Sequence, residues 1–199
     1  MHNVNLEQLQ PYLPKNALVF IEKWINPYPL TLKITRSRQT KLGDYRKLQP
    51  QKRHQITVNG DLNPEAFFFV FTHEIAHMMV YAKYNYGQVA PHGKEWKIIF
   101  GKLLAESIEI YPEEVRIYVA KHAQSPKASV GADSNIAKFL INDSEDYQDY
   151  LEDLQIGTHF KLGQKVFQKG EKRKLRYICC DIKTNKNYLI NATALVEKL

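Results

Sequence analysis

The stretch Asn63–Trp96, NPEAFFFVFTHEIAHMMVYAKYNYGQVAPHGKEW, decides the fold, because it holds the pattern His-Glu-x-x-His inside one long apolar segment. A helix turns by about 100° per residue, so two histidines four positions apart lie one turn apart on the same face. His73 and His77 can then offer two imidazole nitrogens to one metal ion. Glu74 lies one step round that face, where a carboxylate can accept a proton from water without ligating the metal. The pattern predicts a metal site on a helix.

The same stretch carries the signals that begin and end a helix. Asn63 is a good N-cap, Pro64 suits the first helical position, and Glu65 favours the positive end of the helix dipole. No Gly or Pro interrupts the run that follows as far as Tyr84, and Gly87 lies just beyond it. The segment is apolar nearly all round, so we expect this helix at the centre of its domain. Imidazoles and a carboxylate are unfavourable there unless they have partners.

A third ligand is needed, because catalytic zinc usually has three protein ligands and keeps its fourth position for water. His92 is the best choice, since it follows a polar turn and precedes a second apolar-periodic segment. The remaining histidines lie at the N-terminus, in a basic loop or far downstream: His2, His54, His122 and His159. We predict one Zn²⁺ per chain on His73, His77 and His92, with Glu74 as the catalytic base. The alternative is a group of core or surface residues with no chemical role.

The two histidine-bearing motifs, HEIAH at 73–77 and HGKEW at 92–96, resemble those of the SprT-like family of zinc metallopeptidases. That family has H-E-x-x-H, then a later His-Gly with an aromatic residue three or four positions on. The upstream stretches Arg-Ser-Arg, Leu-Gly-Asp-Tyr-Arg and Ile-Thr-Val-Asn resemble the strands before its zinc helix. The resemblance covers roughly residues 5–122. It implies hydrolysis of peptide bonds by metal-activated water, and the Spartan-type members cleave proteins crosslinked to DNA. Many members also carry a C-terminal zinc ribbon with paired cysteines, which this chain lacks.

Length and hydrophobic pattern predict an α+β protein. A chain of 199 residues with 44% hydrophobic content has material for one good core and a small appended module. Residues 5–26 have helical spacing with a break near Pro14, and three strands follow at 30–36, 42–48 and 54–59. We expect a zincin-like domain in which a small antiparallel sheet lies beside the metal-binding helix.

Composition divides the chain at two points. We expect a SprT-like zinc metallopeptidase domain over residues 1–122, a polar and acidic linker over 123–155, and a basic β-rich module over 156–199. In that module the adjacent Cys179 and Cys180 should face opposite sides of a strand. Without a second pair they cannot form a four-cysteine zinc site.

Two segments are strongly basic. Residues 33–53 hold eight Lys and Arg against one Asp, and residues 161–186 hold nine against two acidic residues. Such segments are either solvated surface or contacts for nucleic-acid phosphates. On the second interpretation DNA is a partner in addition to the protein or peptide substrate. The predicted phosphate-binding residues of the first segment are Arg36, Arg38, Arg46 and Lys47.

Other classes of protein are disfavoured. No stretch approaches the ~20 apolar residues that a membrane helix needs, so no membrane partner is expected. The N-terminus lacks a basic-then-apolar signal pattern, and two cysteines do not make a disulfide scaffold. We therefore expect a cytoplasmic protein. The sequence does not indicate an oligomeric state.

Two further functions stay open. One is a nucleic-acid-binding accessory or regulatory protein with a non-catalytic zinc site; Glu74 argues against it, because a structural site needs no general base. The other is a zinc hydrolase of small amides, for which no small-ligand motif is evident. Peptide hydrolysis also calls for a donor to the oxyanion, and the sequence offers five candidates: Tyr81, Tyr84, Tyr86, Arg38 and His54.

Overall fold

The computed structural model describes residues 6–38, 41–48, 53–84, 89–128, 133–141 and 149–199. It is an α+β structure with a small sheet and a second, β-rich C-terminal sheet. The chain divides into two compact units, Met1–Ala128 with Phe139–Ile141, and Ser129–Lys138 with Asn142–Leu199. The predicted functional division into a peptidase domain, a linker and a basic module stays a prediction.

The first unit carries the histidine motifs. Its elements in chain order are the 3₁₀ helix η1 (Leu6–Tyr12), α1 (Ala17–Ile25), β1 (Leu30–Thr35), β2 (Gly43–Leu48), β3 (Arg53–Asn59), α2 (Pro64–Tyr84), α3 (Lys94–Glu106), η2 (Ile108–Ile110) and α4 (Glu113–Gln124). Helix α5 (Ser134–Ile141) follows. None of the helices in the described ranges is long and apolar enough to cross a membrane.

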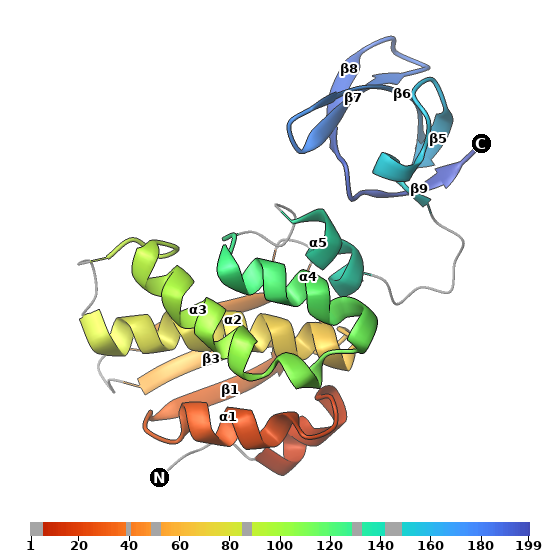
Figure 1. Ribbon diagram of the computed structural model, residues 1–199. Helices are drawn as coiled ribbons and strands as arrows, with labels where there is room; N and C mark the ends of the chain where they lie inside the picture. Colours follow the sequence, from red (N-terminus) through yellow and green to blue (C-terminus); the bar gives the residue numbers. More distant parts are fainter. Residues whose placement is uncertain (1–5, 39–40, 49–52, 85–88, 129–132, 142–148) are drawn as a thin grey trace. The chain divides into compact units, whose positions relative to one another are not determined.

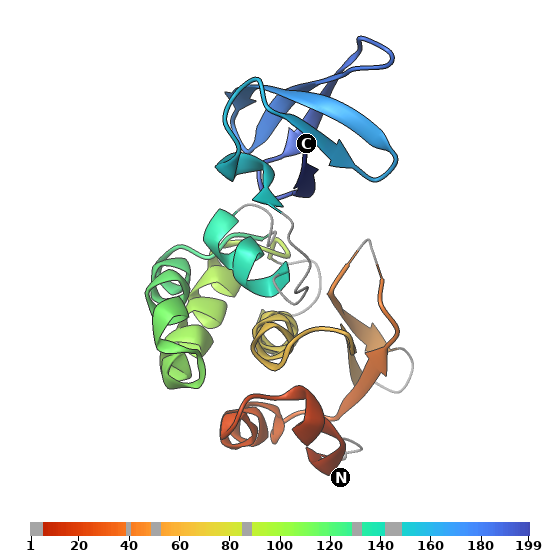
Figure 2. The same cartoon turned by 90° about the vertical axis from the view of Figure 1, so that its right-hand side faces the viewer.

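Helix α2 lies at the centre of the first unit, as its all-round apolar sequence predicts. Seen end-on in Figure 2, it runs between the three-stranded sheet on one side and α3 with α4 on the other. The Asn63 side-chain oxygen accepts the backbone N–H of Ala66 at 2.7 Å, which confirms the predicted N-cap. Four phenylalanines of this helix are buried: Phe67, Phe68, Phe69 and Phe71. The helix is therefore the core element on which the rest of the unit packs.

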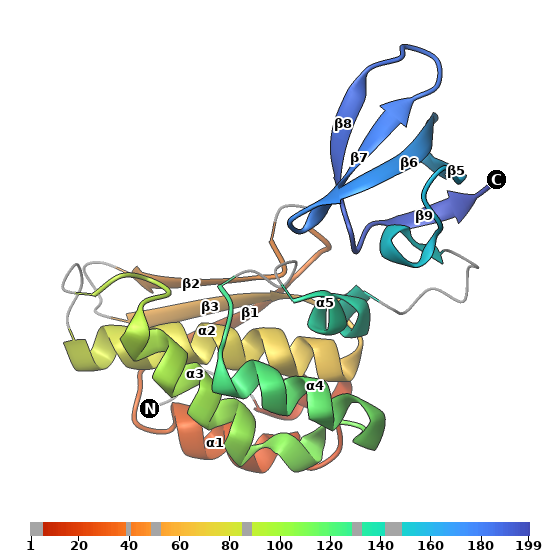
Figure 3. The ribbon, with the colours of Figure 1, turned by 45° about the horizontal axis from the view of Figure 1, so that its top comes forward.

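The sheet is mixed rather than antiparallel. Its order is β1-β3-β2, with β2 antiparallel to β3 as expected, but β1 pairs parallel to β3 (Figure 3). The predicted antiparallel sheet is wrong for β1, because the chain crosses from one edge of the sheet to the other before β2. Arg38, in that crossing, donates to the Asn59 side-chain oxygen at 2.7 Å and to the Thr57 hydroxyl at 3.0 Å. These bonds hold the crossing segment on the central strand.

The N-terminal helical segment is divided where predicted, but its first part is not an α-helix. Residues 5–26 were expected to be helical with a break near Pro14, and the break separates η1 from α1. The first part is a 3₁₀ helix that contains Pro11. Proline has no backbone N–H to give to a preceding turn, which disfavours a regular α-helix there. Both pieces still face the core, through Leu9 in η1 and Ile21 in α1.

The second unit is built on a curled sheet whose strand order is β4-β9-β5-β6-β7-β8 (Figure 1). Its elements are β4 (Asp149–Tyr150), the 3₁₀ turn η4 (Leu151–Asp153), β5 (His159–Leu162), β6 (Lys165–Arg173), β7 (Arg176–Asp181), β8 (Asn187–Asn191) and β9 (Leu195–Lys198). Phe160 and Phe167 stack in its core at 5.7 Å between ring centroids. Cys179 is buried and Cys180 is partly exposed, both as free thiols, which confirms the predicted alternation along β7.

Gly101 provides a test of how closely α3 packs on α4. A Cβ at this position would lie 2.2 Å from the backbone oxygen of Ala123 in α4. Gly→Ala inside a helix normally stabilises by about 1 kcal/mol. We expect Gly101→Ala instead to lower the free energy of unfolding by about 1–3 kcal/mol, because overpacking against backbone is not relieved by a side-chain rotation. Urea denaturation measures this, with Lys97→Ala on the exposed face of α3 as the control. Equal or higher stability of Gly101→Ala would contradict the packing described.

Candidate metal centre

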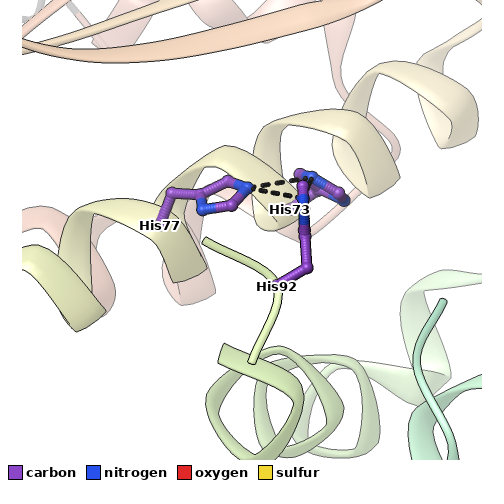
Figure 4. Close-up of side chains that lie close together, drawn as sticks. All are labelled: His73, His77 and His92. Atoms are coloured by element: carbon purple, nitrogen blue, oxygen red, sulfur yellow. Dashed lines mark hydrogen bonds between the residues drawn. The ribbon is translucent and has the colours of Figure 1, made fainter. Parts of the chain in front are cut away.

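Helix α2 brings His73 and His77 to one face, and the loop before α3 brings His92 to meet them (Figure 4). The Nε2 atoms of His77 and His92 are 3.0 Å apart, those of His73 and His77 are 3.2 Å apart, and those of His73 and His92 are 3.3 Å apart. The three predicted ligands therefore point their Nε2 atoms at one another. They lie close enough to bind one metal ion.

The separations fit a tetrahedral ion. Zinc bound to imidazole nitrogens at about 2.0–2.1 Å separates those nitrogens by about 3.3–3.4 Å. The Nε2–Nε2 distances of 3.0–3.3 Å are just below that value. Three imidazoles supply three corners of such a site and leave one open. The donor set and its spacing thus fit the predicted ion.

The electrostatics of the cluster favour neutral imidazoles. Burial, and then the nearby His77 and His92, lower the pKa of His73 to about 2. Burial and the neighbouring His92 lower the pKa of His77 to about 4, and burial lowers that of His92 as well. Neutral imidazole is the form that ligates a metal. When each ring keeps its proton on Nδ1, the three converging Nε2 atoms are all acceptors, and a cation is their natural common partner.

Aromatic rings form the wall behind the three histidines. The buried indole of Trp96 lies 4.7 Å from the rings of His73 and His92 and 5.4 Å from that of His77, measured between centroids. Phe100, one turn later on α3, lies 5.3 Å from His73. These contacts restrict the imidazole orientations and exclude water from one side of the site. The aromatic residue of the HGKEW motif thus has a direct structural role.

Glu74 lies beside the histidines on α2 but contacts the sheet. Only 7% of its surface is exposed. Burial, followed by the nearby charge of Asp44, raises the pKa of Glu74 to about 8. Arg38, Lys41 and a hydrogen bond from the backbone N–H of Tyr45 act in the opposite direction. A carboxyl group whose pKa lies near neutral pH, on the residue next to a metal-ligand candidate, suits a general base.

A second polar cluster lies where β2 and β3 meet α2. The Tyr45 hydroxyl is 2.9 Å from His54 Nδ1, and the Lys47 amine is 3.4 Å from His54 Nε2. Tyr81 of α2 contacts both rings, at 6.1 Å from Tyr45 and from His54. Burial, and then the charge of Lys47, lower the pKa of His54 to about 4. His54 is therefore a neutral residue of the core, and among the described residues it is not part of the histidine group that could hold a metal.

Four of the five candidate oxyanion donors lie among the described residues. Of the five candidates, His54 and Arg38 are bonded within the sheet. Tyr81 packs in the cluster just described, and Tyr84 lies under the Lys83 amine at 5.1 Å. Tyr86 lies outside the described residues.

Three of the four predicted phosphate-binding residues have partners within the chain. Arg38 holds Asn59 and Thr57, Arg46 pairs with Asp44 at 2.6 Å, and Lys47 lies beside His54 and over the Tyr81 ring. Arg36 is exposed, and no ion pair of it occurs among the described residues. The number of Lys and Arg residues in this segment is therefore larger than the number available to bind phosphates. Binding of DNA by these residues stays a prediction.

Residues 23–114 match the sequence model of the SprT-like family. Protein SprT of Glaesserella parasuis serovar 5 (strain SH0165) is 48% identical over 42 residues, which are 21% of this chain and 26% of that protein. Protein SprT of Pectobacterium carotovorum subsp. carotovorum (strain PC1) is 49% identical over 43 residues, which are 21% and 24% of the two chains. The match thus spans about a quarter of the length of these relatives. No solved structure shows significant similarity to the chain.

The geometry predicts one zinc per chain on three histidines. We expect His92→Ala to lose most of the metal at neutral pH, because two imidazoles on α2 leave the ion without a third protein ligand. Metal analysis of the purified chain measures this directly. His159→Ala, at an exposed histidine of β5, is the matched control and should keep one equivalent. Two tightly bound equivalents in the unaltered chain, or full metal retention in His92→Ala, would contradict the assignment.

Proposed function

We propose that this chain is a zinc-dependent endopeptidase of the SprT-like family, whose sequence model residues 23–114 match. The observation that carries the proposal is the convergence of three Nε2 atoms within 3.0–3.3 Å of one another, beside the buried carboxylate of Glu74. A structural metal site has no use for that carboxylate, so Glu74 favours an enzyme over an accessory protein with a non-catalytic zinc. The mixed sheet beside α2 is compatible with a zincin-like fold, which is part of the proposal.

The residues of the site have two roles, binding of the metal and transfer of a proton. His73, His77 and His92 would hold Zn²⁺, which when bound supplies a Lewis acid that polarises the substrate carbonyl and acidifies water. Glu74 accepts a proton from the water whose oxygen attacks the carbonyl carbon of the peptide bond. The same carboxyl then gives that proton to the amine nitrogen as the carbon–nitrogen bond breaks. Trp96 and Phe100 pack behind the imidazole rings and exclude water from that side of them.

The proposed substrate class is protein or peptide, including proteins bound or crosslinked to DNA. The motivation for the second class is the charge of the chain, which is +7 in total and is concentrated in two segments. In the C-terminal segment the side chains of Arg173, Lys174 and Arg176 are exposed, around the turn between β6 and β7. Positive charge on an exposed turn attracts phosphates irrespective of sequence. DNA would then concentrate a DNA-bound substrate near the cleavage site.

Glu74→Gln separates metal binding from chemistry. The change keeps the size and helix propensity of the residue but removes the proton acceptor. We expect the variant to bind one zinc and fold normally, while cleavage of a protein substrate falls at least ~10²–10⁴-fold. Glu65→Gln, in the first turn of the same helix, is the control and should cleave at the rate of the unaltered chain. Cleavage by Glu74→Gln at that same rate would remove Glu74 from the role of base.

DNA binding is tested by its dependence on salt. Arg36 and Arg46 are the exposed members of the predicted phosphate-binding set, whereas Arg38 supports the sheet and is left in place. We expect Arg36→Ala with Arg46→Ala to weaken DNA binding similarly for all sequences. The slope of log affinity against log salt should become shallower by about 1 for each lost phosphate contact.

The control for that pair is Lys94→Ala with Lys97→Ala, which removes the same charge from the exposed side of α3. Cleavage of a DNA-bound protein is measured beside cleavage of the same protein free in solution, and the bound form should be cleaved faster. Absence of binding at about 50 mM salt, or equal slopes for the two pairs of changes, would return these charges to a solvating role.

A further inference from the structure

At Gly43, strand β2 approaches Glu74 more closely than a side chain at that position would allow. A Cβ added at Gly43 would lie 2.8 Å from Glu74 Oε1, 2.9 Å from Glu74 Cγ and 2.7 Å from Val70 Cγ1. Ordinary van der Waals contacts of a Cβ lie at 3.4–4 Å. Val70 and Glu74 are one turn apart on α2, so the strand backbone rests directly on the face that carries the carboxylate. A glycine within a strand often marks such a close approach.

The same strand gives Glu74 a hydrogen bond. The backbone N–H of Tyr45 donates to the Glu74 carboxylate. This donor is free because β2 is an edge strand, paired on one side only, with β3. In an antiparallel pair the backbone groups of alternate residues face the partner strand, and those between them face outward. The Glu74 carboxylate accepts a hydrogen bond from one of these outward-facing N–H groups.

Tyr45 is itself held in place by its side chain. Its hydroxyl is 2.9 Å from Nδ1 of His54, which is 3% exposed. The His54 backbone N–H donates to the Pro29 oxygen at 2.9 Å, and the Lys47 amine lies 3.4 Å from the other ring nitrogen. The Tyr45 ring also stacks on His54 with 5.8 Å between centroids. The backbone N–H of Tyr45 is thus held in place by the pairing of β2 with β3 and by the contacts of the Tyr45 side chain with His54.

We propose that Gly43 and Tyr45 are positioning residues, which together clamp the Glu74 carboxylate in the orientation needed for proton transfer. Gly43 acts by lacking a side chain, so that the strand can close onto α2. Tyr45 acts through its backbone N–H, which selects one orientation of the carboxylate oxygens. The inference rests on the proposed peptidase function for its catalytic meaning, while the clamp itself is a structural contact that can be measured without substrate.

Gly43→Ala tests the clamp through catalysis. The added methyl group must be accommodated, and the far end of the Glu74 side chain is the neighbour that moves most easily, by roughly half an ångström or more. Misplacement of a catalytic group by about 1 Å can reduce the rate ~10²-fold. We expect kcat to fall ~10-fold or more with a smaller change in KM, and one zinc per chain to remain bound.

Gly60→Ala is the matched control. Its Cβ would also meet a side chain at short range, 2.6 Å from Ile34 Cγ2, in the same sheet but away from Glu74. Gly60→Ala should lose stability by a comparable amount. Its kcat should stay within about twofold of that of the unaltered chain, because changes at distant sites with no shared partners act independently. In a Glu74→Gln background, Gly43→Ala should cause no further fall in the residual rate. Equal kcat values for Gly43→Ala and Gly60→Ala would overturn the proposal.

A second measurement, by NMR, needs no substrate and does not depend on whether the Gly43→Ala variant folds. In the ¹⁵N-labelled full chain with one equivalent of Zn²⁺, Glu74→Gln should shift the Tyr45 amide proton upfield and speed its exchange with solvent. The amides of Asp44 and Arg46 should change much less. An unmoved Tyr45 amide would overturn the clamp even if the chain cleaves proteins. Conversely, a shifted Tyr45 amide in a chain that cleaves no protein would leave the clamp standing and remove the proposed function.

Discussion

Helix α2 is buried along most of its length and still carries a hydroxyl, a carboxylate and two imidazoles. Polar groups in such a place need partners, and the surrounding elements supply them one by one. The Thr72 hydroxyl donates to the Phe68 oxygen at 2.7 Å within the helix. The Glu74 carboxylate accepts from β2, and the two imidazoles converge with His92 of the loop before α3, where a cation would be their common partner. Both β2 and the loop before α3 thus face a polar group of α2.

The elements nearest the motif could be predicted from the sequence because they depend on local signals. The N-cap at Asn63, the helix that begins at Pro64, and the meeting of His73 with His77 all follow from spacing and capping within one segment. The position of His92 depends less on local signals, since it is set by how a second helix packs on α2. Its position just before an apolar-periodic segment was enough, because Trp96 and Phe100 of that segment pack on α2 and bring His92 to the same face.

Other features needed contacts between distant residues, which no single-sequence pattern contains. The parallel pairing of β1 with β3 depends on a crossing held by Arg38, and the sequence shows Arg38 only as one more positive charge. Lys169 is a similar case, since it was counted with the basic surface. Its amine is buried, donates to the Leu154 oxygen at 2.5 Å and lies 3.9 Å from the centre of the Tyr177 ring. Gly43 carried a usable signal, because a glycine inside a strand indicates a close approach, but the approaching partner could not be named.

The edge position of β2 has a consequence for how the chain behaves among other chains. An edge strand exposes unpaired N–H and C=O groups that can template the strand of a neighbouring molecule, and this leads to aggregation. On β2 the Tyr45 N–H is already bonded to Glu74, and the charged pair of Asp44 and Arg46 lies on the same strand. A foreign strand adding along this edge would have to displace a buried carboxylate from its donor. Glu74, the proposed base, thereby also protects the open edge of the sheet against edge-to-edge association.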